Sequence, residues 1–366
     1  MKFTCTQENL LKGLTVVSPL AGRNVQLPIL QYVLLEVRDG VLHLTCTDLE
    51  VGAHVSVGGK AEKNGNCAAL ARQLLEYVQQ LPVTEPINIE RKKNKLTITT
   101  KGFSSVFPIS ETDDFPLLPT PPNKEGIIMD GRLFCQGISN TVFAAARDEA
   151  RPEIYSVFIQ GNKGEVRLAA TDSFRLAERV VPVDNEKKFS FLLPVTAAQE
   201  VSRLFGASER LELLIQDNYV VWRGEEMYLS SRLIDGSYPD YQQIIPTSFV
   251  TKGVVKREEL ARALKILSVF LSRESRRVSL LVQPGKEKLT AQVEGGEAGQ
   301  GKVALTFEGE GEDIKVLFNV QYLLDGIQHI GGEQCELELG GESDPVVMRP
   351  VKSSLQQIYL VMPIQA

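Results

Sequence analysis

The residues best suited to acid–base or metal chemistry are few in this sequence of 366 residues. Its three histidines, His43, His54 and His329, lack the spacing of metal ligands, and the first two lie in or beside strand-like segments. We therefore expect hydrogen-bonded structural histidines rather than a metal centre. The carboxylate pairs Asp113-Asp114 and Glu225-Glu226 fall among turn residues, where charge is usually solvated.

Motifs of the common enzyme classes do not occur. The sequence has no GxxxxGK[ST] phosphate loop, no HExxH zinc motif and no GxSxG nucleophile elbow. A glycine-rich stretch at residues 295–301 lies between two strand-like runs rather than before a helix, which indicates a hairpin tip. A catalytic site built from residues far apart in the sequence stays open at this point. We expect no enzymatic activity, no metal and no cofactor.

The cysteines and the apolar stretches indicate a soluble, cytoplasmic protein. An odd number of cysteines without a CxxC pair argues for buried free thiols. No apolar leader is present in residues 1–11, and the apolar run at residues 264–271 is too short for a bilayer and contains Lys265. The cysteines are Cys5, Cys46, Cys67, Cys135 and Cys335.

Basic residues recur beside the expected helices, although the formal net charge is −6. Net charge alone argues mildly against nucleic-acid binding, but a basic stripe can lie on an acidic body. For any single residue, ordinary solvent-facing charge is the alternative. If the repeats described next place these residues on one surface, that surface could contact phosphates without reading sequence. The residues include Lys12, Arg23, Arg72, Arg147, Arg151, Lys256, Arg257, Arg262 and Lys265.

Tight-turn signals repeat along the chain at intervals of about 120–125 residues. Each follows an alternating apolar run, which predicts a β-hairpin. One set consists of Asp39-Gly40, Asn162-Lys163-Gly164 and Pro284-Gly285. A second set consists of Lys93-Asn94, Asp217-Asn218 and Gly340-Gly341.

Helical patterns recur twice in each interval, starting near residues 7, 131 and 256 and again near residues 68, 194 and 319. Proline-containing linkers at residues 119–122 and 246–248 separate the copies. We therefore predict an α+β protein with antiparallel sheets, built from three repeated units at residues 1–122, 123–248 and 249–366.

Several local segments carry a family resemblance. They are Leu27-Pro28-Ile29-Leu30, residues 171–177 (TDSFRLA), residues 233–241 (LIDGSYPDY) and residues 359–364 (YLVMPI). With the three-unit organisation, they make the whole chain resemble the bacterial DNA polymerase III beta subunit, the DNA sliding clamp family.

The resemblance implies a non-catalytic processivity factor that encircles duplex DNA without sequence specificity. Two copies would associate head to tail into a ring of DNA-clamp units, with helices lining the inner face and sheets outside. A head-to-tail contact closes into a ring where its rotation permits. The alternative is a repeat-built peptide-binding scaffold that does not act on DNA.

The resemblance also implies a hydrophobic pocket between units two and three. Its partners would be the replicative DNA polymerase subunit, the clamp loader and other proteins with a short clamp-binding motif rich in Gln, Leu and Phe; no membrane partner is expected. Taken singly, each of these apolar residues fits an ordinary place in the core better than a place in a pocket. The apolar wall would comprise Ile154, Thr171, Leu176, Pro239, Ile244, Leu360 and Met362. The rim and neighbours would comprise Ser173, Phe174, Arg175, Gln243, Tyr322, Met348, Val361, Pro363 and Ile364.

The chain departs from the family pattern beside this pocket. Phe174 stands where histidine or tyrosine is frequent, Gln243 replaces a frequent arginine, and Gln365-Ala366 replaces a basic-then-apolar ending. These departures concern motif preference and affinity rather than the pocket itself.

For DNA binding and for the contact between copies, the resemblance implies two further sets. The DNA-contacting residues would be Arg23, Arg72, Arg147 and Arg151, of which the first two match family positions best. The dimer contact would use Phe107 and Ile109 from unit one, and Phe270 and Leu271 from unit three. The alternative for these four apolar residues is an ordinary place in the core of their own unit.

Overall fold

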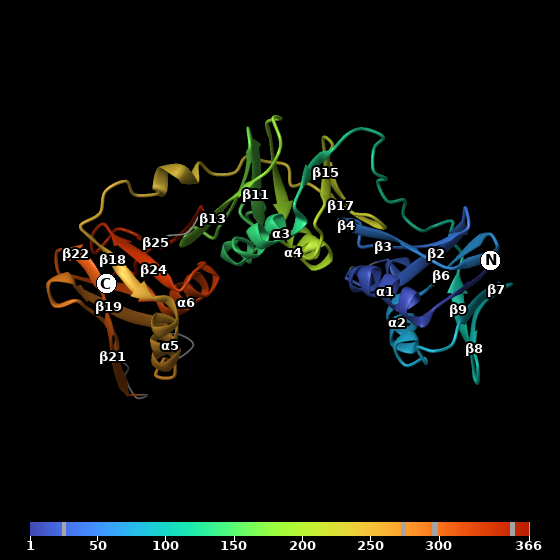
Figure 1. Ribbon diagram of the computed structural model, residues 1–366, viewed down its shortest axis with the longest axis horizontal. Helices are drawn as coiled ribbons and strands as arrows, with labels where there is room; N and C mark the ends of the chain where they lie inside the picture. Colours follow the sequence, from blue (N-terminus) through green and yellow to red (C-terminus); the bar gives the residue numbers. More distant parts are fainter. Residues whose placement is uncertain (24–26, 272–275, 295–298, 352–355, 366) are drawn as a thin grey trace. The chain divides into compact units, whose positions relative to one another are not determined.

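One order of elements recurs in each third of the chain: a strand, a helix, a run of strands, a second helix and more strands. The computed structural model describes residues 1–23, 27–271, 276–294, 299–351 and 356–365 (Figure 1). All strand pairs within it are antiparallel, so the predicted α+β class is confirmed.

The first third contains β1 (Lys2–Cys5), α1 (Gln7–Val17), β2 (Tyr32–Arg38), β3 (Val41–Thr47), β4 (Val51–Val57), β5 (Lys60–Lys63), β6 (Gly65–Leu70), α2 (Ala71–Gln79), β7 (Ile87–Lys92), β8 (Lys95–Thr100) and β9 (Phe103–Ser110). The middle third contains β10 (Ile127–Met129), α3 (Gly131–Ser139), β11 (Ser156–Asn162), β12 (Glu165–Thr171), β13 (Arg175–Pro182), β14 (Phe189–Pro194), α4 (Val195–Phe205), β15 (Leu211–Ile215), β16 (Tyr219–Arg223) and β17 (Met227–Arg232).

The last third contains β18 (Thr251–Lys256), α5 (Arg257–Ser268), β19 (Arg277–Gln283), β20 (Lys288–Glu294), β21 (Gln300–Thr306), β22 (Glu308–Gly311), β23 (Ile314–Asn319), α6 (Val320–His329), β24 (Gln334–Leu339), β25 (Val346–Pro350) and β26 (Gln357–Val361). Short 3-10 turns include η3 (Val142–Ala144) and η4 (Tyr241–Ile244).

The predicted turns and helix starts are confirmed. The turns join β2 to β3, β7 to β8, β11 to β12, β15 to β16, β19 to β20 and β24 to β25. The glycine-rich stretch lies between β20 and β21, which pair as a hairpin, while residues 295–298 themselves lie outside the described residues. Ala366 also lies outside them.

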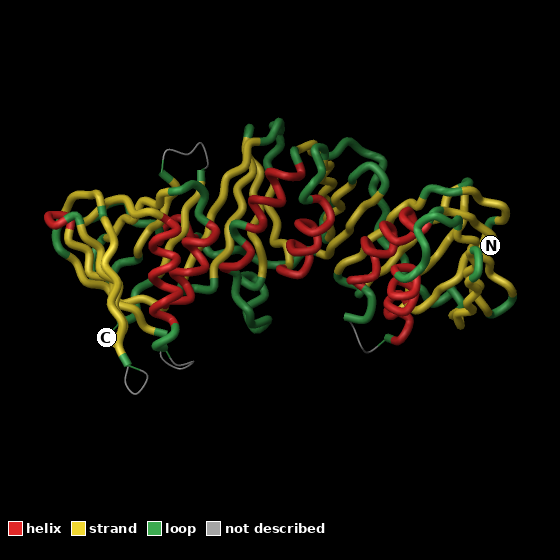
Figure 2. Tube along the Cα trace, turned by 60° about the horizontal axis from the view of Figure 1, so that its bottom comes forward, coloured by secondary structure: helices red, strands yellow, loops and turns green. Residues whose placement is uncertain are grey.

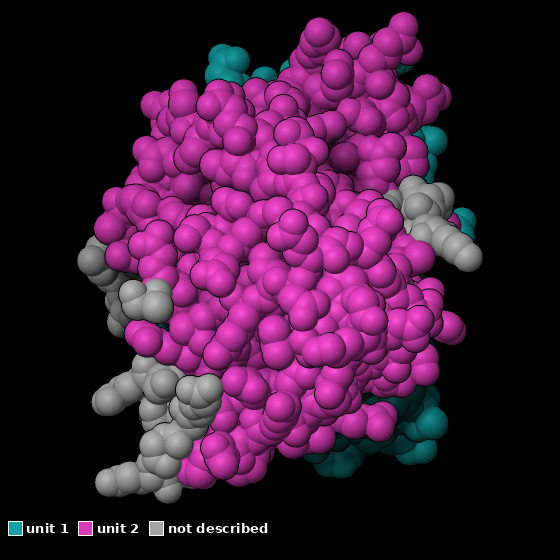
Figure 3. Space-filling view, turned by 90° about the vertical axis from the view of Figure 1, so that its left-hand side faces the viewer, with its two compact units in different colours: residues 1–131, 203–233 teal, residues 132–202, 234–366 magenta. Residues whose placement is uncertain are grey.

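The chain packs into two compact units, which are described separately here (Figure 3). Unit 1 comprises residues 1–131 and 203–233, and unit 2 comprises residues 132–202 and 234–366. This division passes through the middle third of the chain. The three-unit boundaries drawn from the linkers therefore stay a prediction.

Each unit places helices on one face of its strands (Figure 2). Unit 1 has the strand order β10-β15-β16-β17-β4-β3-β2-β6-β9-β8-β7-β1-β5. Unit 2 has the orders β14-β11-β12-β13-β26-β25-β24-β18-β22 and β21-β20-β19-β23. No helix in the described ranges is long and apolar enough to cross a membrane.

Local sequence explains how the helices dock. In α1, the Thr6 side chain caps the first turn, and Leu10, Leu14 and Val17 are buried at helical spacing. In α6, a side chain at Gly326 would collide with the Tyr359 ring, so the absence of one lets the helix approach β26 closely. This close packing fixes α6 against the strand that precedes the chain end.

Candidate binding groove in unit 2

The turn between β12 and β13 has a fixed shape because its own side chains bind its backbone. Thr171 Oγ1 donates to the Arg175 carbonyl at 2.6 Å and accepts from Ser173 N at 3.1 Å. Asp172 Oδ1 accepts from Phe174 N at 3.0 Å and Arg175 N at 3.1 Å. Ser173 has a φ of 77°, in the left-handed region. The turn holds Phe174 outward with 59% of its surface exposed.

Arg175 points inward from this turn and is 3% exposed. Its Nε donates to Asp172 Oδ2 at 2.9 Å, its Nη1 to Asp325 Oδ2 at 2.5 Å and its Nη2 to the Phe143 carbonyl at 2.9 Å. The guanidinium also lies over the Tyr322 ring, 4.6 Å from its centroid. Arg175 therefore joins the turn to α6 and η3 and supports the turn from its buried side.

Apolar side chains form the floor. Leu176 in β13 stands opposite Leu360 in β26, and both are buried. They pack in one cluster with Ala169, Tyr241 and Val347. Partly buried side chains extend this cluster toward the surface; they are Phe158, Tyr238, Ile245, Phe249, Ile358 and Met362.

A buried polar contact fixes the tyrosine in this cluster. Tyr241 Oη donates to Glu178 Oε2 at 2.6 Å. Burial raises the pKa of Tyr241, and the Glu178 carboxylate raises it further. The phenol therefore stays protonated and holds η4 against β13.

The segment after β26 is bound through its backbone. Met362 N donates to the Phe174 carbonyl at 2.8 Å, and Ile364 N donates to the Leu317 carbonyl at 2.7 Å. Met362, Pro363 and Ile364 are half-buried. The apolar chain end thus lies between the turn and β23 with one side open to solvent.

An aromatic and basic rim adjoins this segment. The rings of Phe174 and Tyr322 stack with centroids 6.5 Å apart and an interplanar angle of 25°. Arg151 Nη1 donates to Ser173 Oγ at 3.2 Å. Burial raises the pKa of Tyr322, as does the nearby Asp172 carboxylate.

The residues predicted for the pocket fall into three groups by exposure. Ile154, Thr171, Arg175, Leu176, Met348, Leu360 and Val361 are buried and can act only as wall or support. Ser173, Phe174, Pro239, Gln243 and Ile244 are exposed, while Tyr322, Met362, Pro363 and Ile364 are half-buried. Gln243 is held by Asp240, whose Oδ2 accepts from Gln243 Nε2 at 2.7 Å.

Sequence reasoning missed the groups that position the groove. Tyr241 and Tyr238 belong to the segment at residues 233–241 that carries the family resemblance, so that segment could have identified them. Asp325 and Phe143 gave no signal, because their roles depend on the fold bringing α6 and η3 to Arg175.

The basic residues predicted for DNA lie in separate places. Arg23 is exposed and donates from Nε to the Pro19 carbonyl at 3.0 Å. Arg72 pairs with Glu76 at 2.9 Å and its side chain is 91% exposed. Arg147 and Arg151 are exposed in the loop after η3.

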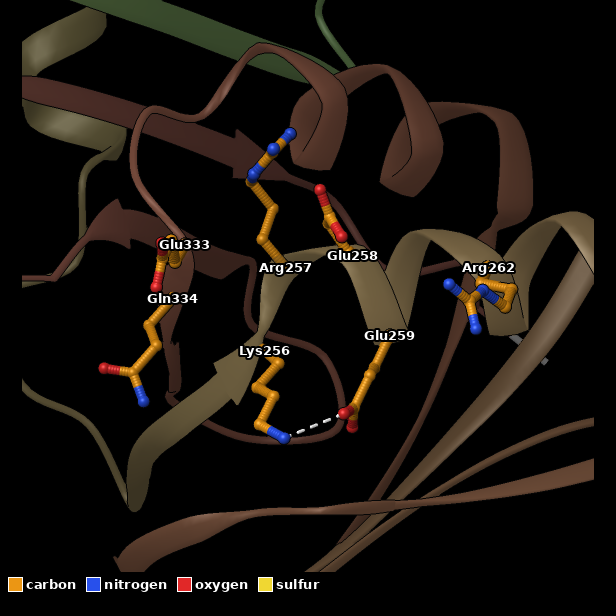
Figure 4. A pocket seen from close by; sticks show the side chains of 7 residues that line it. All are labelled: Lys256, Arg257, Glu258, Glu259, Arg262, Glu333 and Gln334. Atoms are coloured by element: carbon orange, nitrogen blue, oxygen red, sulfur yellow. Dashed lines mark hydrogen bonds and ion pairs between the residues drawn. The ribbon is translucent and has the colours of Figure 1, made fainter.

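The start of α5 carries a hollow of about 400 Å³ with mixed charge (Figure 4). Lys256 pairs with Glu259 at 3.0 Å, and Arg257 Nε donates to the Gly332 carbonyl at 2.8 Å. Cations and carboxylates alternate around it, so it provides no field of one sign. The lining residues are Lys256, Arg257, Glu258, Glu259, Arg262, Glu333 and Gln334.

The residues predicted for the contact between copies are partly core. Phe107 is buried and packs edge-on against Tyr77, with centroids 5.1 Å apart. Ile109, Phe270 and Leu271 are half-buried.

Other apolar side chains near them are far more open. Phe103 and Val106 on β9 are 51% and 56% exposed, and Ile266 and Val269 at the end of α5 are 50% and 78% exposed.

The histidines are hydrogen-bonded and the cysteines are buried free thiols, as predicted. His43 Nδ1 lies 3.3 Å from Ser56 Oγ, and His54 Nδ1 lies 3.0 Å from Thr45 Oγ1. All five cysteines are free and buried. Within the described ranges no cluster of three His, Cys, Asp or Glu side chains could hold a metal ion.

The chain matches three models of one family in succession. The N-terminal domain of the DNA polymerase III beta subunit matches residues 1–119, the central domain matches residues 129–240 and the C-terminal domain matches residues 242–365.

Individual relatives resemble the chain over its full length. The beta sliding clamp of Synechococcus elongatus is 29% identical, with 100% of this chain and 99% of the relative covered. The crystal structure of the DNA polymerase III beta subunit from Thermotoga maritima superposes with a TM-score of 0.93 at 28% identity, covering 100% of this chain and 99% of that one. A sliding clamp from Pseudomonas aeruginosa bound to griselimycin gives 0.95 at 26% identity, with both chains fully covered.

Proposed function

Because the chain belongs to the family of DNA polymerase III beta subunits, the sliding clamps, we propose that it encircles duplex DNA as a head-to-tail homodimer. It would act without catalysis, in the cytoplasm, as a processivity factor that tethers the replicative polymerase. The clamp loader and other proteins with the clamp-binding motif would use the same groove. We keep the three units, 1–122, 123–248 and 249–366, as the proposed building blocks.

Free strand edges and exposed apolar residues support the homodimer. Among the described residues β21 pairs only with β20, and the first part of β9 pairs only with β8. Free edges of this kind favour pairing with another chain. Phe103 and Val106 lie on β9, and Val269 directly follows α5, a helix that packs against β21. A β9 edge of one copy joined to the β21 edge of another would cover both, with Phe107, Ile109, Phe270 and Leu271 behind the contact.

Helices with exposed arginines support the DNA contact. Arg23 and Arg72 lie beside α1 and on α2 of unit 1. Scattered cations bind phosphates weakly and without sequence preference, which suits a protein that must slide. A net charge of −6 then discourages side-on binding elsewhere. Arg151 contacts the Phe174 turn in unit 2, so for Arg147 and Arg151 a contact with a bound partner protein is the alternative to DNA.

The observation that carries the peptide groove is the apolar cluster that runs from buried Leu176 and Leu360 to half-buried Met362. A concave apolar site with a few polar groups at its rim suits a short peptide with Leu and Phe anchors. Methionine adapts its shape to different side chains.

Retention on DNA tests the clamp proposal. The full chain would be loaded onto nicked circular DNA by its loader and then washed at high salt. We expect retention on the circle and rapid loss once the circle is cut to a linear form, because only topology holds the ring. Equal retention on both forms contradicts encirclement.

Peptide binding tests the groove separately. Removal of residues 362–366 should abolish binding of a Gln-Leu-Phe motif peptide while leaving the dimer intact, since this segment forms one wall. Removal of Gln365 and Ala366 alone is the matched control and should change little. Unchanged affinity after the longer truncation refutes the groove, and peptide binding without any DNA retention favours the scaffold alternative.

A further inference from the structure

We infer that three exposed arginines extend the unit 2 groove into a basic subsite that favours partner segments with acidic residues beside the apolar motif. The residues are Arg147, Arg151 and Arg276. The inference rests on the proposed peptide groove and adds a preference for the charge of the partner segment.

The loop that carries two of these arginines is closed at its base. Ala146 N donates to the Ile154 carbonyl at 3.0 Å, and Ile154 N donates to the Arg151 carbonyl at 3.2 Å. Arg151 Nη1 then reaches Ser173 Oγ at 3.2 Å, on the turn that exposes Phe174. The Arg151 charge is therefore held at the groove rim.

Arg276 approaches the same rim from the start of α6. Its carbonyl accepts from Val320 N at 2.8 Å, two residues before Tyr322. The charges of Arg147 and Arg276 both lower the pKa of Tyr322, against the larger effect of burial. The charges of Arg147 and Arg276 thus act on the Tyr322 hydroxyl, while Arg151 contacts the turn that exposes Phe174.

Carboxylates also lie near this subsite, and the two beside Arg175 are already occupied. Asp172 and Asp325 are both paired with Arg175. Asp148 accepts from Ala150 N at 2.9 Å within the arginine loop, and Glu149 beside it is exposed. In the described part of the chain none of the three exposed arginines forms an ion pair with a carboxylate, so no direct contact neutralises their charge.

An acidic peptide fits this arrangement better than a nucleic acid does. Phe174 in the rim is hydrogen-bonded through its carbonyl to Met362, which packs on the apolar floor. Such a floor suits Leu or Phe side chains of a bound peptide. Cations beside such a floor steer acidic segments and raise the association rate, with strong dependence on salt. Single-stranded DNA would instead need successive stacking platforms along a basic track.

Two fluorescent peptides with one Gln-Leu-Phe motif test the inference by anisotropy with the full chain. One has Asp and Glu flanks, and the other has Ser and Asn flanks. We expect the acidic peptide to bind roughly tenfold more tightly at low salt and about twofold more tightly near 0.5 M salt, because screening removes the advantage.

A triple variant, R147Q with R151Q and R276Q, should equalise the affinities of the two peptides. R262Q, which removes an exposed arginine on α5, is the matched control and should keep the difference. Equal binding by the unaltered chain overturns the inference while the groove stands. Failure of both peptides to bind overturns groove and subsite together. Displacement of the acidic peptide by an equally charged short oligothymidylate at equal concentration overturns the assignment to a peptide.

Discussion

The same turn occurs in both units, and its surroundings differ. In unit 1, Thr47 Oγ1 donates to the Val51 carbonyl at 3.0 Å, and Asp48 Oδ1 accepts from Glu50 N and Val51 N. Leu49 has a φ of 82°, against 77° for Ser173 in unit 2. The turn at residues 171–175 has the same bonds in the same order. A shared Thr-Asp sequence therefore sets one backbone scaffold twice.

The strand opposite each turn supplies different chemistry. In unit 1, β4 pairs with β17, so Ser231 stands opposite Val51 and Ser230 opposite Gly52. In unit 2, the corresponding residues on β26 are Val361, which stands opposite Arg175, and Leu360, which stands opposite Leu176. The unit 1 turn borders a hollow of about 290 Å³ with Arg232 on its wall, where unit 2 has Met362. Backbone geometry is thus repeated, while the neighbouring strand presents different side chains to the turn.

Replacing Arg175 should have the largest effect in this comparison. In R175M, Asp325 and Asp172 lose their buried partner, which we expect to destabilise unit 2 by about 3–5 kcal/mol. The equivalent change in unit 1, V51A, removes only apolar contacts and should cost about 2 kcal/mol. Hydrogen exchange of the β13 and β26 amides measures unit 2, and fluorescence of the single tryptophan, Trp222, measures unit 1.

A second change separates lost pairing from lost packing. Adding D325L to R175M should recover more than half of the loss, because the uncompensated buried carboxylate is removed. A loss below about 1 kcal/mol for R175M alone would mean that the ion pairs contribute little beyond their own desolvation.

The second-largest effect is expected on peptide binding. It should follow from exchanging Arg232, at the end of β17, and Met362, which follows β26. M362R copies Arg232 into the unit 2 groove and should weaken the motif peptide at least about tenfold, since a charge replaces an apolar contact. R232M makes the reverse change in unit 1 and should leave that affinity unaltered. Titration calorimetry measures both, and equal effects of the two variants would argue against the groove in unit 2.

A third difference between the units concerns one position on each of the two strands that flank the turn. These strands are β3 and β4 in unit 1, and β12 and β13 in unit 2. Unit 1 has stacked rings, with His43 and His54 centroids 5.1 Å apart and Tyr228 4.8 Å beyond. The equivalent positions in unit 2 hold Arg167 and Glu178, 3.5 Å apart. Burial, with a smaller effect of His43, lowers the pKa of His54 to about 4.

This pKa predicts acid sensitivity of unit 1. Because the folded value lies below the ordinary value of 6.5, the unfolded chain binds more protons as the pH falls from about 6.5 toward 4, and stability falls with it. We expect a loss on the order of 1 kcal/mol between pH 7.5 and pH 5 from this group, after allowance for solvent screening. Urea unfolding followed by Trp222 fluorescence should show a smaller loss in H54F, and an equal loss in both would assign the effect to other groups.

The sequence predicted the scaffold better than the groove. Alternating runs that end in Asp39-Gly40 or Lys93-Asn94 fix hairpins locally, so strands, turns and helix starts were predictable. The role of Arg175 was not, because its partner Asp325 is distant in sequence and reaches it only through α6. Phe107 shows the same limit: its alternation marks a strand, but only packing against Tyr77 shows that it is buried.

The smallest expected effect concerns backbone strain shared by the two turns. Leu49 and Ser173 occupy left-handed conformations that cost a non-glycine residue about 1–2 kcal/mol, while glycine avoids this cost but has more freedom to lose on folding. L49G and S173G should therefore each stabilise their unit by about 0.5 kcal/mol relative to L49A and S173A. Trp222 fluorescence measures the free energy of unfolding for unit 1, and hydrogen exchange of the β13 and β26 amides measures it for unit 2. Since the two φ angles agree within a few degrees, the gains should also agree. A gain at one turn alone would show that the flanking groups, such as Arg151 on Ser173, alter the backbone preference.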